Sequence, residues 1–241
     1  MEKGKRIALG EKKNTIEIWD NSKRVKILFS VFWVLIVCTI IGIVSGYLEL
    51  QLLKRAQLEF FIDEGEAHSN DLRQKIIGLL QTVIFIVSVI VFLNWFRRAY
   101  GNLHRLGISY LEYKESMALW AWFIPIIVLF RPVKIMNEIW KETQWYIKKT
   151  DNTYKIEKSS VVIGIWWGFF IVSNFVGRYV LKNAFKQDTL EQLIEGSQAF
   201  LIADIIQIPE ALLVILIVHR SSKIESKLAH EIKKNRRYSC L

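Results

Sequence analysis

Two acidic residues and an amide share one face of an apolar segment in the last third of the chain. Asp204, Gln207 and Glu210 lie in AFLIADIIQIPEALLVILIVHR, and at about 100° per helical residue they fall within an arc of about 120°. Ionisable side chains are costly in hydrocarbon, so within a membrane they face other protein segments or a polar pathway. The segment therefore predicts either a proton or cation site or a buried structural contact.

Partners for these side chains stand in the preceding apolar segment. Asn174 and Arg178 are four residues apart and share one helix face. We expect Arg178 to pair with Asp204, because both lie near the same end of neighbouring spans. For Glu210 two interpretations stay open, a charged transport site or a structural residue that is protonated or hydrogen-bonded. The structural partners offered by an earlier segment are Gln81, Thr82 and Ser88.

The segments that carry these residues belong to a set of four long apolar runs. Hydrophobic residues make up 52% of the chain, while the net charge is +10. A membrane helix needs about 20 apolar residues to cross about 30 Å of hydrocarbon, and runs of that length occupy residues 27–48, 76–96, 161–181 and 199–218. We therefore predict an all-α integral membrane protein with four transmembrane helices in one membrane domain, residues 27–219.

The distribution of basic residues predicts how these spans are oriented. A basic arm (1–26), the middle stretch (97–158) and a basic tail (220–241) together hold 26 of the 33 Lys and Arg residues. Basic residues concentrate on the cytoplasmic side of a membrane protein. We expect both termini and the middle stretch to be cytoplasmic, and we expect the protein to lie in a bacterial inner membrane.

The stretch WAWFIPIIVLFRP decides whether a fifth segment crosses the membrane. Residues 117–130 would form about 21 Å of helix, too short for the hydrocarbon core, and Pro125 and Pro132 each remove a backbone donor. A fifth full span would also abolish the charge asymmetry. We therefore expect residues 117–132 to form a re-entrant half-helix, with a short or tilted fifth span as the alternative.

Amphipathic stretches flank this segment on both sides. In the first, Tyr100, Leu103 and Tyr110 recur at helical spacing, and in the second Met136, Ile139 and Trp140 do so. Basic residues accompany both stretches, as is typical of helices that lie in the headgroup region of a bilayer. We expect two interfacial helices that contact anionic headgroups.

Three blocks of sequence resemble a known family. FLNWFRRAYGNLHRLG, WAWFIPIIVLFRPVKIMNEIW and GIWWGFFIVSNFVGR resemble the bacterial membrane proteins described as domain of unknown function 4328. The positions that carry the resemblance are Trp95, Arg98, Asn102, Leu103, Leu106 and Gly107, then Trp122, Phe123, Pro125, Leu129, Pro132, Glu138 and Trp140, then Trp166 and Trp167. The chain departs from the pattern at Val128 and Val133. The resemblance implies the membrane architecture and leaves the activity open.

Cofactor chemistry and catalysis are poorly supported by the residue types. His104 and His219 make no ligand set, and Cys38 and Cys240 have neither metal spacing nor the pattern of a disulfide framework. No nucleophile motif or phosphate-binding loop is present. We expect no cofactor, no metal, no nucleic-acid partner and no enzymatic activity.

Two functional hypotheses follow from these observations. The first is a non-enzymatic membrane protein that binds a partner or organises lipid, with the segment around 120–140 as its docking surface. The second is a small permease or channel that uses Glu210 in the last span. A homo-oligomer or another protein partner is compatible with both, since four spans enclose little room.

Overall fold

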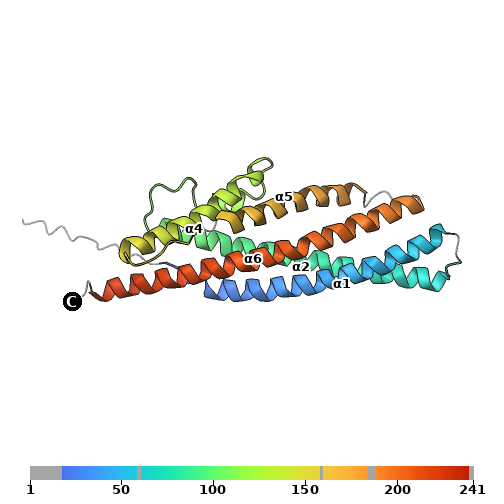
Figure 1. Cartoon of the computed structure of the whole chain (residues 1–241), viewed down its shortest axis with the longest axis horizontal. Coiled ribbons are helices and arrows are strands. Elements are labelled where there is room, and N and C mark those ends of the chain that lie inside the picture. The colour runs from blue at the N-terminus through green and yellow to red at the C-terminus, as the bar shows by residue number, and fades with distance from the viewer. Residues whose placement is uncertain (1–17, 59–60, 158–159, 184–187, 239–241) are drawn as a thin grey trace, which may run out of the picture.

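The computed structural model describes residues 18–58, 61–157, 160–183 and 188–238, and over these residues it is helical with no strand. The elements are α1 (Ser22–Gln57), α2 (Glu64–Arg105), α3 (Met117–Trp120), the 3₁₀ turn η1 (Ile127–Leu129), α4 (Arg131–Thr150), α5 (Ser160–Asn183) and α6 (Leu190–Tyr238). Five of the helices among the described residues are long, and an irregular segment stands between α2 and α4 (Figure 1).

Four of the helices are long and apolar enough to cross a membrane. They are α1, α2, the part of α5 from Val161 to Lys182, and α6, and each contains one of the four apolar runs. The predicted all-α class is therefore confirmed for the described residues, and the four predicted spans coincide with the four candidate membrane helices. With 36, 42 and 49 residues, α1, α2 and α6 are each longer than about 30 Å of hydrocarbon requires, so they extend beyond the span.

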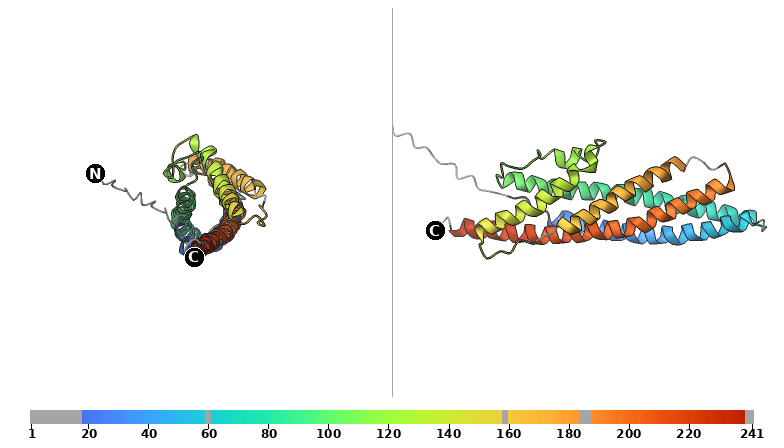
Figure 2. Two further views of the ribbon diagram at one scale, coloured as in Figure 1. Left: turned by 90° about the vertical axis from the view of Figure 1, so that its left-hand side faces the viewer. Right: turned by 45° about the horizontal axis from the view of Figure 1, so that its top comes forward.

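The long helices lie side by side, and α4 joins them at one end only. α1 packs against both α2 and α6, and α5 packs along α6. α4 contacts α2, α5 and α6 at the end where α2 finishes, α5 starts and α6 finishes (Figure 2). We call this the cap end, and we call the assembly of α4 with residues 92–105 of α2 and residues 211–232 of α6 the cap bundle. The opposite end, where α1 and α5 finish and α2 and α6 begin, is the far end.

Local sequence explains where α2 begins and ends. Asp63 precedes the helix, and its side chain accepts a hydrogen bond from the Gly65 backbone N–H at 3.0 Å, which satisfies one of the free donors of the first turn. After Arg105 the chain turns at Gly107, whose φ of 74° lies in the left-handed region that glycine adopts without strain. The Leu-Gly pair of the family pattern is therefore the end of this helix.

Many of the most completely buried side chains lie in the cap bundle. Trp95, Phe96 and Tyr100 of α2 are 0% exposed, as are Ile135 and Met136 of α4. Along the spans many apolar side chains are exposed, as expected of a surface that faces lipid. The protein therefore has a close-packed core at the cap end, formed by the ends of the apolar runs together with residues beyond them.

This core corrects the prediction of two interfacial helices. α2 continues from its apolar run to Arg105 without a break, and Tyr100 and Leu103 of the first amphipathic stretch are buried against protein. In α4, Ile139 and Trp140 are 4% and 3% exposed. Because α4 packs across α2 and α6, neighbouring helices cover the apolar faces that the sequence pattern assigned to lipid, except at Tyr110, which is 62% exposed.

The expected half-helix at residues 117–132 is also not formed. α3 is only four residues long, tight turns follow, and η1 adds three residues before α4 starts at Arg131. Ile126 has a φ of 68°, which is strained for a β-branched residue. Pro125 stands at this interruption, and Pro132 lies in the first turn of α4, where its missing N–H costs nothing. The segment is therefore neither a helical fifth span nor a half-helix.

Candidate functional site

Asp204 meets α2 rather than α5. The side-chain amide of Gln81 donates to both carboxylate oxygens of Asp204, at 3.1 and 3.0 Å. Gly42 of α1 lies where the two side chains meet, and a Cβ there would lie 2.1 Å from Gln81 Nε2 and 2.7 Å from Asp204 Oδ2. The predicted pair of Asp204 with Arg178 is not formed, because Gln81 reaches Asp204 across the glycine. A side chain at position 42 would thus displace Gln81 or Asp204 from this contact.

The other two members of the α6 polar face contact two further helices. The Thr39 hydroxyl of α1 donates to Gln207 Oε1 at 2.7 Å. The Ser173 hydroxyl of α5 donates to Glu210. Of the structural partners considered for Glu210, the structure shows none of Gln81, Thr82 and Ser88, since the bonded hydroxyl lies on α5. One face of α6 therefore holds α1, α2 and α5 through three separate polar contacts.

A groove of about 660 Å³ opens beside this polar face. One wall is α2, with Phe85, Val89 and Phe92, and the opposite wall is α5. Side chains of α1 and α6 form the floor. Several lining residues are themselves exposed, among them Phe85 at 50% and Leu181 at 65%. The groove is therefore open to the surroundings of the spans and has the volume of a small-molecule site.

Polar groups in the groove gather on α5 and α6. Ser173, Asn174 and Arg178 line it from α5, and Gln207 and Glu210 line it from α6. The wall formed by α2 is apolar except for Ser88, whose hydroxyl donates to the Phe85 carbonyl at 2.7 Å. The structure thus brings together every polar residue predicted for the last two spans except Asp204, which is occupied by Gln81.

The segment between α3 and α4 closes the cap end of the groove. Trp122, Phe123 and Val128 form this end, and the indole Nε1 of Trp167 donates to the Leu129 carbonyl at 3.0 Å. Trp122 is the centre of an aromatic cluster with centroid distances of 5.5 to 6.3 Å to Phe92, Phe96, Trp166, Trp167 and Phe170. Aromatic positions of the family pattern therefore connect the groove to the cap bundle.

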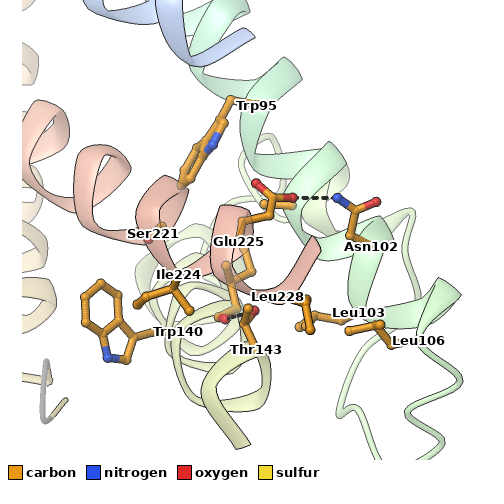
Figure 3. A pocket seen from close by; sticks show the side chains of 12 residues that line it. Trp95, Asn102, Leu103, Leu106, Trp140, Thr143, Ser221, Ile224, Glu225 and Leu228 are labelled. Carbon is orange, nitrogen blue, oxygen red and sulfur yellow. Dashed lines mark hydrogen bonds between the residues drawn. The ribbon is translucent and has the colours of Figure 1, made fainter. Parts of the chain in front are cut away.

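Asn102 joins three parts of the chain inside the cap bundle. Its Oδ1 accepts from the Trp19 backbone N–H at 2.9 Å, and its Nδ2 donates to the Trp19 carbonyl at 2.9 Å. The same Nδ2 donates to Glu225 of α6 (Figure 3). The residue is 2% exposed. Asn102 therefore anchors the segment before α1 and the end of α6 to α2.

The carboxyl group of Glu225 is enclosed although the residue as a whole is half-buried. Asn21 Nδ2 donates to its second oxygen at 3.4 Å. Burial raises the pKa of this carboxyl above its usual value, and the hydrogen bond from Asn102 opposes that shift. A cavity of about 10 Å³ lies beside it, lined in part by Trp95 and Ser221, and this is the space that one water molecule needs.

Two arginines of α2 stack on the same N-terminal segment. The guanidinium carbons of Arg98 and Arg105 lie 4.2 and 3.3 Å from the ring centre of Trp19. Cations over an aromatic face are attracted by its quadrupole. Arg98 of the family pattern therefore contacts the Trp19 ring, while Asn102 hydrogen-bonds to the Trp19 backbone.

Glu138 and Trp140 fasten the loops of the cap bundle to α4. Glu138 accepts from the Tyr100 hydroxyl at 2.8 Å and from the Glu112 backbone N–H at 2.8 Å. Burial, followed by the neighbouring Glu138, raises the pKa of Tyr100. Trp140 Nε1 donates to the Glu157 carbonyl at 3.1 Å. These two residues thus fix the connections on either side of α4.

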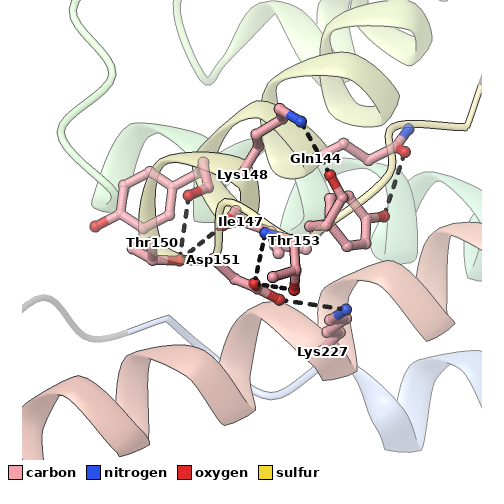
Figure 4. Close-up of polar contacts among 9 residues, drawn as sticks. Gln144, Ile147, Lys148, Thr150, Asp151, Thr153 and Lys227 are labelled. Atoms are coloured by element: carbon pink, nitrogen blue, oxygen red, sulfur yellow. Dashed lines mark hydrogen bonds and ion pairs between the residues drawn. The ribbon is translucent and has the colours of Figure 1, made fainter.

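The connection between α4 and α5 is further held to α6 (Figure 4). Lys227 lies 3.8 Å from Asp151 Oδ2, and Asp151 Oδ1 accepts from the Thr153 backbone N–H at 3.0 Å. The hydrogen bonds from Thr153 hold the pKa of Asp151 below its usual value. Lys148 donates to the Tyr154 carbonyl at 3.2 Å. These contacts place the start of α5 beside the cap bundle.

Metal-binding geometry does not occur in the part of the chain that the structure describes. No group of three His, Cys, Asp or Glu side chains there could hold an ion. His104 and His219 instead contact rings, with centroids 5.1 Å from Tyr100 and 6.0 Å from Phe29.

Several site residues were missed by sequence reasoning. Thr39, Gly42 and Ser173 are small residues inside apolar runs, and only their isolation among apolar neighbours sets them apart. Glu225 lies in a charged stretch that reads as a solvated helix, and Trp19 lies in a basic arm. Long-range packing gives these residues their roles, and no local pattern reveals it.

These features define a class of protein, an all-helical chain with four candidate membrane spans and a packed cap at one end. A family model described as Domain of unknown function (DUF4328) matches residues 59–223, more than half of the chain. The chain belongs to this family, which confirms the resemblance seen in the sequence. No curated protein and no solved structure matches the chain.

Proposed function

We propose that the protein is a non-enzymatic integral membrane protein that binds the hydrocarbon chain of a membrane lipid in the groove between α2 and α5. The observation that carries this proposal is the groove itself, about 660 Å³ in volume and lined mainly by aromatic and aliphatic side chains. Ligand sites have this size and this composition, with a few polar groups that fix orientation.

The position of the groove along the apolar parts of the helices supports a ligand that comes from the bilayer. Its walls belong to the apolar runs of α2 and α5, so the open side faces hydrocarbon when the helices span a membrane. A lipid chain gains contact with a fixed apolar wall through van der Waals packing. The polar residues on α5 and α6 then contact the polar part of the ligand.

The proposed orientation places the cap bundle in the cytoplasm of a bacterial cell, with both termini on that side of the inner membrane. The supporting observation is that 26 of 33 basic residues belong to the arm, the tail and the middle stretch. Asn152 is exposed in the α4–α5 connection. In a variant with Cys38→Ser, Cys240→Ser and Asn152→Cys, we expect an impermeant thiol reagent to label permeabilised cells but not intact ones. Labelling of intact cells would reverse the orientation.

Two glycines of α5 provide a matched test of lipid binding. Gly177 lines the groove, and a Cβ added there meets nothing within 4 Å, so Gly177→Phe projects a ring into the open space. Gly168 is exposed on the same helix, is not among the lining residues, and has equally free surroundings. Gly168→Phe is therefore the control.

The measurement is the amount of lipid that stays with the purified protein in mild detergent, determined by native mass spectrometry. We expect Gly177→Phe to lose the tightly held lipid and Gly168→Phe to keep it. Equal retention by the two variants would rule out the groove as the binding site, since the ring blocks only the groove.

A permease is the second candidate, because Gln207 and Glu210 both line the groove. Toward the cap end, however, the inward positions of α6 are apolar, and Val214, Ile217 and Val218 are all buried. Polar groups therefore do not continue across the membrane on this helix. Proton flux into proteoliposomes that is abolished by Glu210→Gln would favour the permease, whereas lipid binding predicts no flux with either protein.

A further inference from the structure

Arg178 occupies a distinctive place in the groove. It lines the groove from α5, yet its side chain is also exposed, and it lies in the last two turns of the apolar run. A long basic side chain near the end of a span extends its charged group toward the headgroups. The guanidinium can therefore lie at the mouth of the groove, at the level of the lipid headgroups.

The two acids of the α6 polar face have other partners. Asp204 accepts from Gln81, and Glu210 accepts from Ser173. Among the residues that the structure describes, no carboxylate lies within 4.0 Å of the Arg178 guanidinium. Glu210 meets α5 at Ser173, five residues and about 7.5 Å along the helix from Arg178. Within the described part of the chain, the positive charge at the mouth is thus not paired with an acid.

We propose that the lipid in the groove is anionic, with its phosphate-bearing headgroup on Arg178 and its chain directed toward Trp122. This inference rests on the proposed function and names the class of ligand. The guanidinium presents a planar fork of N–H donors that fits phosphate oxygens. The charge at the mouth of the groove is therefore complementary to that of an anionic headgroup.

The length of the groove fits one leaflet. From Arg178 to Trp166, the lining residue nearest the cap end of α5, there are twelve residues, or about 18 Å of helix. Half of a hydrocarbon core of about 30 Å is about 15 Å. A chain that starts from a headgroup on Arg178 therefore reaches the aromatic end of the groove, where Trp122 and Trp166 lie.

A competition between two lipids tests this inference. The purified protein is offered equal amounts of phosphatidylglycerol and phosphatidylcholine with identical chains, and the bound lipids are counted by native mass spectrometry. We expect wild-type protein to favour phosphatidylglycerol about fivefold, the preference expected of one basic residue near an anionic surface. In Arg178→Gln we expect the preference to fall to about one, because bound phosphatidylglycerol falls toward the level of bound phosphatidylcholine.

Lys182 supplies the matched control, because it is an exposed basic residue one turn further along α5 and is not among the lining residues. Lys182→Gln should keep the preference. Arg178→Lys keeps the positive charge but loses the planar set of guanidinium donors, so it should keep part of the preference for phosphatidylglycerol. This variant replaces Arg178→Gln in the test if Arg178→Gln fails to fold.

The outcomes separate the two proposals. No preference in wild-type protein, or a preference that survives in Arg178→Gln, would overturn the anionic ligand while leaving chain binding in place. If Gly177→Phe retains all its lipid, the groove is not the site and the proposed function fails with it. Loss of preference in Lys182→Gln to the same extent as in Arg178→Gln would show a general surface charge effect and would also overturn the inference.

Discussion

Replacement of Asn102 by alanine should lower the free energy of unfolding by more than the loss of one hydrogen bond, because Asn102 makes several hydrogen bonds in the cap bundle. Asn102→Ala removes two hydrogen bonds to the Trp19 backbone and one to Glu225. Each hydrogen bond contributes about 0.5–1.5 kcal/mol, and an enclosed group left without its partner adds about 1–3 kcal/mol. Because Glu225 is half-buried, we expect a loss of about 2–4 kcal/mol in the free energy of unfolding.

The loss should depend on pH. Burial raises the pKa of Glu225, so its contribution to stability is greatest when the carboxyl is protonated and is lost as the pH rises from the unfolded pKa through the folded one. Removal of Asn102 takes away a donor that favours the charged form. The deficit of Asn102→Ala should therefore be smaller at pH 5 than at pH 8.

Chemical unfolding in mild detergent, followed by Trp fluorescence, measures this deficit. Asn137→Ala is the control, since Asn137 donates only to the Val133 carbonyl of its own helix, at 2.9 Å, and should lose less than about 1 kcal/mol. If Asn102→Ala were no less stable than Asn137→Ala, or if its deficit did not change with pH, the interpretation of Asn102 as the anchor of the N-terminal segment would be refuted.

Three further predictions concern other parts of the fold. Gly42→Ala should destabilise the protein by about 1–3 kcal/mol in the same unfolding assay, because the added Cβ would overlap Gln81 and Asp204. In the control Gly46→Ala, the added Cβ meets its nearest neighbour at 3.4 Å and should be tolerated. Equal effects of the two substitutions would contradict the close approach of Gln81 and Asp204 to Gly42. Ile126→Gly should relieve about 1 kcal/mol of backbone strain with little loss of packing, since Ile126 is 72% exposed, and a clear drop in stability would show that the turn is not strained. Thr153 holds the pKa of Asp151 below its usual value, so the stability that Asp151 adds is present above the unfolded pKa and is lost as the pH falls through the lowered folded value. Asp151→Asn should therefore differ from wild type at pH 7 and converge with it in strong acid, once the pH is below that lowered value. A difference of unchanged size in strong acid would exclude this ionisation.

The architecture within the apolar runs was predictable from the sequence. Run length alone identified the four candidate spans, because a run of about 20 apolar residues is long enough to cross the hydrocarbon core as a helix with all its backbone groups hydrogen-bonded. The cap bundle was misinterpreted for a physical reason. A basic amphipathic helix looks the same whether its apolar face contacts lipid or protein, and only the length of α2 and α6 beyond the apolar runs decides that Tyr100 and Ile139 are covered by helices.

The candidate site was predicted in part. Hydrophobic patterning placed Gln207 and Glu210 on one face together, and the structure shows them in a groove with Asn174 and Arg178. The hydrogen-bond partners of the individual residues could not be derived. Whether Asp204 contacts Arg178 or Gln81 depends on which helices pack beside α6. That choice depends on Gly42, a residue of a third helix whose role appears only when the helices are packed.

Determination of the structure in lipid nanodiscs at a resolution that reveals ordered lipid is the most direct test of the proposed groove. We expect a chain-shaped density between α2 and α5 that begins at Arg178 and ends beside Trp122. A structure in which α5 closes against α2, with no lipid between Phe85 and Leu181, would contradict the proposal.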